Sequence, residues 1–194
     1  LVVKVRDQVL RDGFTNSMTD ANASVSVSAS EDEFNFDWND ETYSGIELSA
    51  SEWHNVLSKA ADDGNSDVVL IDCRNDYESD IGSFCGSLKL NTNKFSDTWK
   101  KLDSLLEKID IVDNVDVKKS VKIYTFCTGG IRCAKTNYYL KKKHGFENVY
   151  GLQDGIIAYE KWQQSDNKNN KNNENTSLFE GENFLFDQRR LEES

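Results

Sequence analysis

The chain has 194 residues, of which 37% are hydrophobic, and its formal net charge is -11. This length allows one sizeable domain with tails, and the acidic balance excludes a surface that attracts nucleic acid as a whole. Any role on RNA would need a local basic patch or a further domain. Because the first residue is not Met, we expect a piece of a longer protein.

The four cysteines show none of the paired CxxC spacing of a structural zinc site, so we expect no metal and no cofactor. Residues 1–7 carry too many charges for a signal peptide. The longest apolar run, residues 68–71, is far shorter than a membrane span. We therefore expect a cytoplasmic protein with free thiols and no membrane contact.

Composition divides the chain into five segments. Residues 1–14 begin with an apolar–polar alternation that predicts one strand, the last of a truncated upstream domain. Residues 15–44 are rich in Ser, Asn and acids and predict a flexible linker. The compact domain is expected over 45–162. Residues 163–177 are Asn/Lys-rich and predict disorder, whereas the tail 178–194 regains apolar residues and is a candidate for packing back on the domain.

Within the expected domain, strands and helices alternate. Ser49 and Glu52 form a capping box, which predicts a helix with Trp53 and Leu57 on its apolar face. Further predicted elements are strands over 68–71, 121–126 and 146–150 and helices over 99–109, 133–143 and 156–162. This alternation predicts an α/β fold with a central parallel sheet and helices on both faces.

Chemically capable residues follow two of these strands. Asp72, Cys73 and Arg74 come after the first strand, and Cys127 comes directly after the second. In parallel α/β sheets, sites form at the carboxyl ends of the strands. We therefore expect one site at this edge, with Asp72 and Arg74 as a structural pair that supports the neighbouring loop.

The segment after Cys127 predicts a reactive thiolate. Its two glycines let successive backbone amides turn inward toward one point, and the helix that follows adds the positive end of its dipole. A thiolate held this way is a nucleophile that can accept sulfur as a persulfide. The predicted active loop consists of Cys127, Thr128, Gly129, Gly130, Ile131 and Arg132.

The length of this loop bears on the chemistry. Four residues separate Cys127 from Arg132, whereas cysteine phosphatases have five in the corresponding cradle for phosphate. The smaller ring suits a single sulfur atom better than a tetrahedral oxyanion. We therefore rank phosphatase activity below sulfur transfer.

The order of motifs resembles the rhodanese sulfurtransferases. The loop Cys-x-x-Gly-x-Arg follows an upstream strand that ends in Asp72-x-Arg74 and leads to Glu78, and Gly155 and Trp162 match the closing segment. The resemblance covers about residues 45–162. It implies a rhodanese-like fold with Cys127 as the catalytic residue, and a sulfur donor such as thiosulfate or a protein persulfide.

A narrower resemblance is to the tRNA uridine hydroxylases of bacterial type, over residues 72–78, 127–133 and 180–189. It implies oxygen-dependent hydroxylation of a wobble uridine, an essential loop cysteine, an upstream ferredoxin-like domain, and tRNA as a partner of the full-length protein. The chain departs from the rhodanese or hydroxylase pattern at Ser83, Ser87, Asp154 and Asn183.

Several roles stay open at this point. Cys133 is either a resolving thiol that forms a disulfide with oxidised Cys127 or a core residue of the following helix. Cys73 and Cys85 are expected to be packing residues, and Glu78 is expected to brace a loop. The function hypotheses are a tRNA-modifying enzyme, a generic sulfurtransferase, and a rhodanese-like interaction module without catalysis.

Overall fold

The computed structural model describes residues 41–63, 68–169 and 176–184. The strand predicted over 1–14 and most of the predicted linker lie outside these residues. Among the described helices, none is long and apolar enough to cross a membrane.

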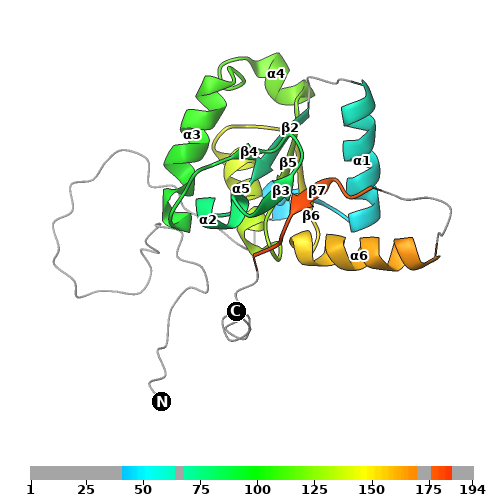
Figure 1. Cartoon of the computed structure of the whole chain (residues 1–194). Helices are drawn as coiled ribbons and strands as arrows, with labels where there is room; N and C mark the ends of the chain where they lie inside the picture. The colour runs from blue at the N-terminus through cyan, green and yellow to red at the C-terminus, as the bar shows by residue number, and fades with distance from the viewer. Residues whose placement is uncertain (1–40, 64–67, 170–175, 185–194) are drawn as a thin grey trace.

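A parallel sheet of five strands forms the centre of the structure (Figure 1). The strand order is β1-β6-β5-β2-β4, and every neighbouring pair is parallel. In the pairing of β2 with β5, Asp72 lies opposite Phe126, so Cys73 and Cys127 leave the sheet side by side. The strands are β1 (Ile46–Leu48), β2 (Val68–Asp72), β4 (Leu88–Lys89), β5 (Lys122–Phe126) and β6 (Asn148–Leu152).

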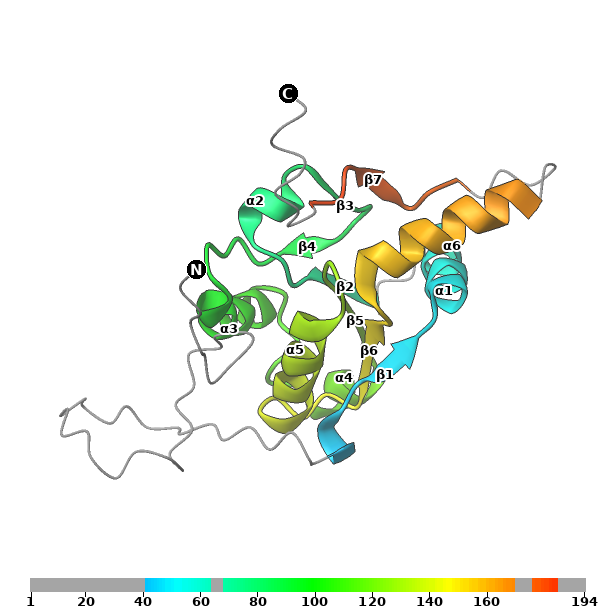
Figure 2. The ribbon, with the colours of Figure 1, turned by 90° about the horizontal axis from the view of Figure 1, so that it is seen from below.

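Helices cover both faces of this sheet, as Figure 2 shows. On one face lie α1 (Ala50–Asp63) and α6 (Gly155–Asn169), and on the other lie α3 (Thr98–Lys108), α4 (Val115–Ser120) and α5 (Ile131–Lys142). The predicted fold class is thereby confirmed.

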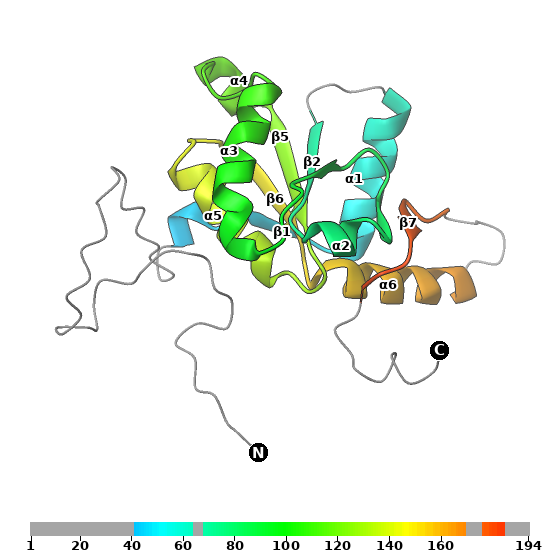
Figure 3. The same cartoon turned by 60° about the vertical axis from the view of Figure 1, so that its left-hand side comes forward.

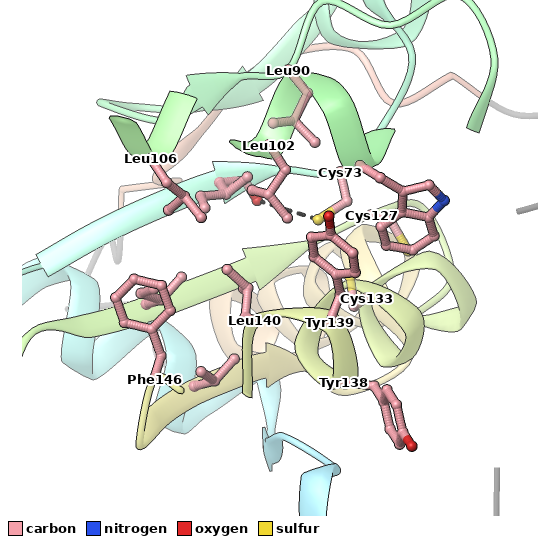
Figure 4. Close-up of a cluster of buried hydrophobic side chains, with 14 of the residues drawn as sticks. Cys73, Leu90, Leu102, Leu106, Cys127, Cys133, Tyr138, Tyr139, Leu140 and Phe146 are labelled. Carbon is pink, nitrogen blue, oxygen red and sulfur yellow. Dashed lines mark hydrogen bonds between the residues drawn. The ribbon is translucent and has the colours of Figure 1, made fainter. Parts of the chain in front are cut away.

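Each face has its own apolar cluster. Under α1 and α6, the rings of Trp53, Phe84 and Phe126 pack edge to face. Figure 4 shows the other cluster, where Leu102, Leu140 and further side chains surround three cysteines. Burial of each such side chain stabilises the fold by about 1.5–3 kcal/mol. The two clusters therefore stabilise the sheet, including the edge that carries the site.

A second, two-stranded sheet lies beside this edge; Figure 2 shows both of its strands, and Figure 3 shows one of them, β7. In it, β3 (Gly82–Phe84) pairs antiparallel with β7 (Phe179–Gly181). The ring of Phe179 contacts that of Phe84 at 5.3 Å between centroids, so the start of the C-terminal tail packs on the domain. Short elements complete the fold: η1 (Glu41–Tyr43), α2 (Asp76–Ser79) and η2 (Phe95–Asp97).

The structure differs from the sequence prediction beyond Trp162. We expected disorder over 163–177, but α6 continues to Asn169, so the prediction is wrong for 163–169. Extending an existing helix costs little compared with nucleating one, which lets residues without an apolar pattern continue it. The predicted linker also ends early, because its last residues form η1. Residues 170–175 and 185–194 lie outside the described part of the chain.

Candidate active site

Cys127 lies at the end of β5, in the loop that leads into α5. Gly130 caps α5 with a φ of 86°, a backbone conformation that favours glycine. Its amide donates to Cys127 Sγ at 3.1 Å, and the backbones of Cys133 and Gly129 also favour the thiolate form of this sulfur. The two glycines therefore produce the converging amides that the sequence led us to expect.

These contacts stabilise the thiolate form of Cys127. A hydrogen bond from the Cys133 thiol outweighs burial, and together with the charge of Arg132 and the amides of Cys133 and Gly129 it lowers the pKa of Cys127 to about 6. Cys127 is 1% exposed, so a bulky molecule reaches the sulfur only after the surrounding segments move.

This lowered pKa predicts the pH dependence of the thiol. We expect the ultraviolet absorbance of the thiolate, taken as the difference between the wild-type protein and Cys127→Ser, to rise with a midpoint near pH 6. An ordinary thiol would titrate about 2.5 units higher. A midpoint above pH 8 would contradict the description of this loop as a thiolate site.

Arg132 does not hydrogen-bond the Cys127 sulfur in the structure; its guanidinium turns to Glu78. Its Nη1 and Nη2 donate to the two carboxylate oxygens of Glu78 at 2.6 and 2.7 Å. Nη2 also donates to Thr128 Oγ1, whose hydroxyl donates to Glu78. Arg132 therefore acts on the thiolate through space, as a fixed charge, while it anchors the loop.

Glu78 receives these bonds from the first turn of α2. Its carboxylate also accepts the backbone amide of Asn75 at 3.1 Å, which fixes the side chain against the loop. Burial raises the pKa of Glu78, but the hydrogen bonds and charge of Arg132 outweigh it, and the pKa is lowered. The structure thus places Glu78 as the loop brace that its position after the first strand suggested.

Asp72 and Arg74 form a buried ion pair next to the loop. Arg74 Nη2 donates to Asp72 Oδ2 at 2.7 Å, with both side chains 0% exposed. The same nitrogen donates to the carbonyl of Gly82 at 2.5 Å. The guanidinium carbon lies 5.8 and 5.7 Å from the ring centroids of Phe126 and Phe179. This pair ties β2, β3, β5 and β7 together, and neither of its side chains hydrogen-bonds the Cys127 sulfur.

Two of the departures from the rhodanese pattern join this network. The Ser83 hydroxyl donates to Asp72 Oδ2 at 2.8 Å and also hydrogen-bonds Ser87 Oγ. Sequence reasoning did not assign Ser83 a contact, because its partner lies eleven positions away in another element. The serine supplies a neutral donor to the carboxylate at this point.

The start of α6 holds the loop from its other side. The amides of Ile156 and Ile157 donate to the carbonyls of Cys127 and Thr128 at 3.0 and 3.2 Å. Gly155 has a φ of 65°, and a Cβ there would lie 2.4 Å from the Cys127 carbonyl oxygen. Glycine is therefore required at position 155 for the start of α6 to lie this close to the loop. The sequence showed this glycine only as part of the closing motif.

A cavity of about 410 Å³ lies beside the loop, between α5 and the ends of β1 and β6. It touches the site through Gly130 and Cys133, and Asn137, Gly151 and other residues complete its lining. A molecule in this cavity would contact the loop backbone rather than the Cys127 sulfur. Among the described residues, no group of three or more His, Cys, Asp or Glu side chains is placed to hold a metal ion.

Comparison with known proteins agrees with this geometry. The sequence model of the rhodanese-like domain matches residues 54–165. A tRNA uridine(34) hydroxylase of Prochlorococcus marinus is 36% identical over 75% of this chain and 40% of its own length. That of Teredinibacter turnerae is 38% identical over 75% of this chain and 37% of its own.

The chain therefore spans about two fifths of the length of these relatives. Among solved structures, the Alr3790 protein from Anabaena is 19% identical, with a TM-score of 0.44 over 75% of this chain and 98% of its own. The family match extends over more than half of the chain and includes the whole cysteine loop. The chain belongs to the rhodanese-like domain family.

Proposed function

We propose that this chain is the rhodanese-like part of an enzyme that hydroxylates a uridine in tRNA, with the Cys127 thiolate as its essential nucleophile. The relatives that carry this activity in their names match the chain across the cysteine loop. The observation that carries the proposal is the Cys127 sulfur itself, which accepts the amide of Gly130 at 3.1 Å in a loop that lowers its pKa to about 6. A thiol that served only for packing would need no converging donors.

The acidic balance of the chain bears on how tRNA would bind. A net charge of -11 repels phosphates over most of the surface. We therefore assign most of the tRNA-binding affinity to the parts of the full-length protein that this chain does not span. The rhodanese-like domain then contributes the reactive sulfur rather than the affinity.

The test uses the full-length protein in cells that lack their own enzyme. Hydroxylated uridine is measured by mass spectrometry of digested tRNA for wild type, Cys127→Ser and Cys85→Ser. We expect the amount of hydroxylated uridine to be at least about 100-fold lower in Cys127→Ser, because the substitution removes the nucleophile. Cys85 is exposed and bonds Glu180 rather than the loop, so Cys85→Ser is expected to keep wild-type levels. Product from Cys127→Ser at the wild-type level would refute the proposal.

A second candidate function is sulfur transfer through a persulfide on Cys127. The thiolate would attack the outer sulfur of thiosulfate, so that one S–S bond forms on Cys127 while the S–S bond of thiosulfate breaks and sulfite leaves with its electron pair. The observation that favours it is the amide of Gly130, directed at the cysteine sulfur, because such donors stabilise anionic sulfur.

Intact mass after incubation with thiosulfate tests this candidate. The expected result is a gain of one sulfur atom in wild type and in Cys85→Ser, and no gain in Cys127→Ser. If the wild-type protein gained no sulfur atom, thiosulfate would be eliminated as the donor. The same measurement with a protein persulfide would then decide whether a persulfide is the donor. Failure of the tRNA and sulfur tests together would leave the interaction module.

A further inference from the structure

The cavity beside the active loop contains a buried hydrogen-bond donor that is unpaired within the described residues. Asn137, on α5, is 3% exposed and belongs to the lining of this cavity. Its Oδ1 accepts from the hydroxyl of Thr125 at 2.6 Å, so its amide nitrogen is the free end of the side chain. None of the described residues accepts a hydrogen bond from this nitrogen. Because an unpaired buried donor costs free energy, its place on a cavity wall points to a ligand that accepts from it.

Two glycines make room for this amide. A Cβ at Gly45 would overlap the Asn137 side chain, and a Cβ at Gly151 would lie 2.9 Å from Asn137 Nδ2. Both glycines also line the cavity. Their backbones therefore fix the amide nitrogen at the cavity wall, and a larger residue at either position would displace it.

A carboxylate from the edge strand shares the cavity. Glu47 on β1 is paired in register with Gly151 on β6, which is paired with Thr125 on β5; Figure 2 shows these strands beside α5. Register partners in a parallel sheet direct their side chains to the same face, and a Cβ at Gly151 would face Asn137 on α5. Glu47 therefore extends from that face, and it lines the cavity. Since Gly151 has no side chain, the position between Glu47 and Asn137 is left open.

These two side chains form a donor and an acceptor at one planar slot. Asn137 offers an N–H group and Glu47 offers carboxylate oxygens, from strands and a helix that enclose about 410 Å³. Sites for small molecules have volumes in this range. The hydrogen-bonding edge of uracil or guanine has a carbonyl oxygen beside an N–H, which matches a donor next to an acceptor. Asparagine and glutamate are side chains that bind base edges in this way.

We propose that the cavity between α5 and β1 binds a nucleobase, whose carbonyl oxygen accepts from Asn137 Nδ2 and whose N–H donates to Glu47. The choice of RNA as the source of this base rests on the proposed function. The bound base is not the one that reacts, because the cavity meets the loop at Gly130 and Cys133 rather than at the Cys127 sulfur. It belongs to a neighbouring nucleotide of a single-stranded loop, where bases are free to leave the stack.

Titration of the wild-type chain with uridine and with guanosine tests the site, followed by ¹⁵N-resolved NMR spectra. We expect the amide signals of Gly45, Gly130 and Gly151 to shift, together with the side-chain amide of Asn137. Gly145 lies beyond the other end of α5, and its signal is expected to stay in place. 3-Methyluridine and 1-methylguanosine lack the N–H, and we expect them to bind about tenfold more weakly.

A short single-stranded RNA that contains both bases distinguishes the two sources of the ligand. Cavity shifts with the RNA alone would assign the site to bases within a chain, and shifts with the nucleosides as well would assign it to the base itself. Absence of cavity shifts with all of these ligands would overturn the proposal. Equal affinity for the methylated and unmethylated nucleosides would overturn it too.

Substitutions test each hydrogen bond separately. Glu47→Met removes the acceptor at an exposed position of the edge strand, and Asn137→Leu removes the donor. We expect each to raise the dissociation constant about tenfold. Glu147→Met is the matched control, because Glu147 is exposed and lies outside the lining of the cavity; its affinity is expected to be that of the wild type. Wild-type affinity in Glu47→Met would refute the assigned contact.

The test remains decisive if Asn137→Leu does not fold. Glu47→Met and the methylated nucleosides leave the core unchanged, so they decide the proposal without that variant. The titrations also need no reaction at Cys127. Base binding with no effect of Cys127→Ser in the tRNA assay would therefore overturn the proposed function alone, and loss of product in Cys127→Ser without base binding would overturn this inference alone.

Discussion

Replacement of Asp72 by asparagine is expected to lower the free energy of unfolding by about 3–5 kcal/mol, the cost of breaking a buried ion pair on one side. Arg74 would keep its bond to the carbonyl of Gly82 and its two aromatic neighbours. Asp72 accepts from Nε, Nη2 and the backbone amide of Arg74 in the wild type. With asparagine in its place, the positive charge of Arg74 would remain fully buried without an anionic partner. Asparagine has nearly the same shape, so the loss would come from charge and not from a cavity.

Urea unfolding measures this difference, and the chain offers a matched control. Asp80 pairs with Lys89 at 3.1 Å, but both side chains are exposed, by 70% and 36%. Asp80→Asn is expected to change stability by less than about 1 kcal/mol. The double variant Asp72→Asn/Arg74→Met should recover part of the loss, because it removes the uncompensated charge as well. If Asp72→Asn cost no more than Asp80→Asn, the pair would not hold this edge of the sheet.

Much of this site could be predicted because its signals are local. The run before Cys127 is apolar enough for a buried strand, and the two glycines after it predicted converging amides and a helix, which begins at Ile131, two residues before the predicted start. The rule that parallel strands end at one edge of the sheet predicted that Cys73 and Cys127 share this edge, whereas their position side by side depends on the pairing of β2 with β5. The strands, the loop and the helix could therefore be predicted from residues that are neighbours in the sequence.

The partners of these residues were harder to predict, because they lie far apart in the chain. Arg132 could be expected to carry a charge into the loop, but its carboxylate partner lies 54 positions earlier, in a helix of four residues. β1, β3 and β7 are three residues each and have too few positions to show an alternation. Their existence depends on pairing, as β7 does on β3, and pairing is decided by tertiary packing.

Substitution of Arg132 by methionine is expected to have the second large effect, and to reverse a pH dependence. Glu78, 0% exposed, would lose the guanidinium that donates to both of its oxygens. An unpaired carboxylate in this position costs about 3–5 kcal/mol at pH 7. The hydroxyl of Thr128 and the amide of Asn75 would remain as its donors.

The sign of the pH effect follows from the pKa of Glu78. In the wild type this pKa is lowered by Arg132, so the stabilisation is complete above the ordinary value of a glutamate and is lost as pH falls through the folded-state pKa. In Arg132→Met only burial and neutral donors remain, so the folded-state pKa is raised above the ordinary value. Glu78 then binds a proton on folding, and the variant should gain stability as pH falls from 7 toward 5.

Urea unfolding of Arg132→Met at pH 5 and pH 7 measures this reversal. Cys127 also titrates in this range, and its pKa should rise when the charge of Arg132 is removed. The double variant Glu78→Gln/Arg132→Met removes the Glu78 carboxylate and keeps the change at Cys127, so the difference between the two variants isolates Glu78. We expect the free energy of unfolding to fall between pH 5 and pH 7 in Arg132→Met but not in the double variant. The same pH slope in both would mean that Glu78 stays ionised without Arg132, and that the brace of the active loop does not depend on this ion pair.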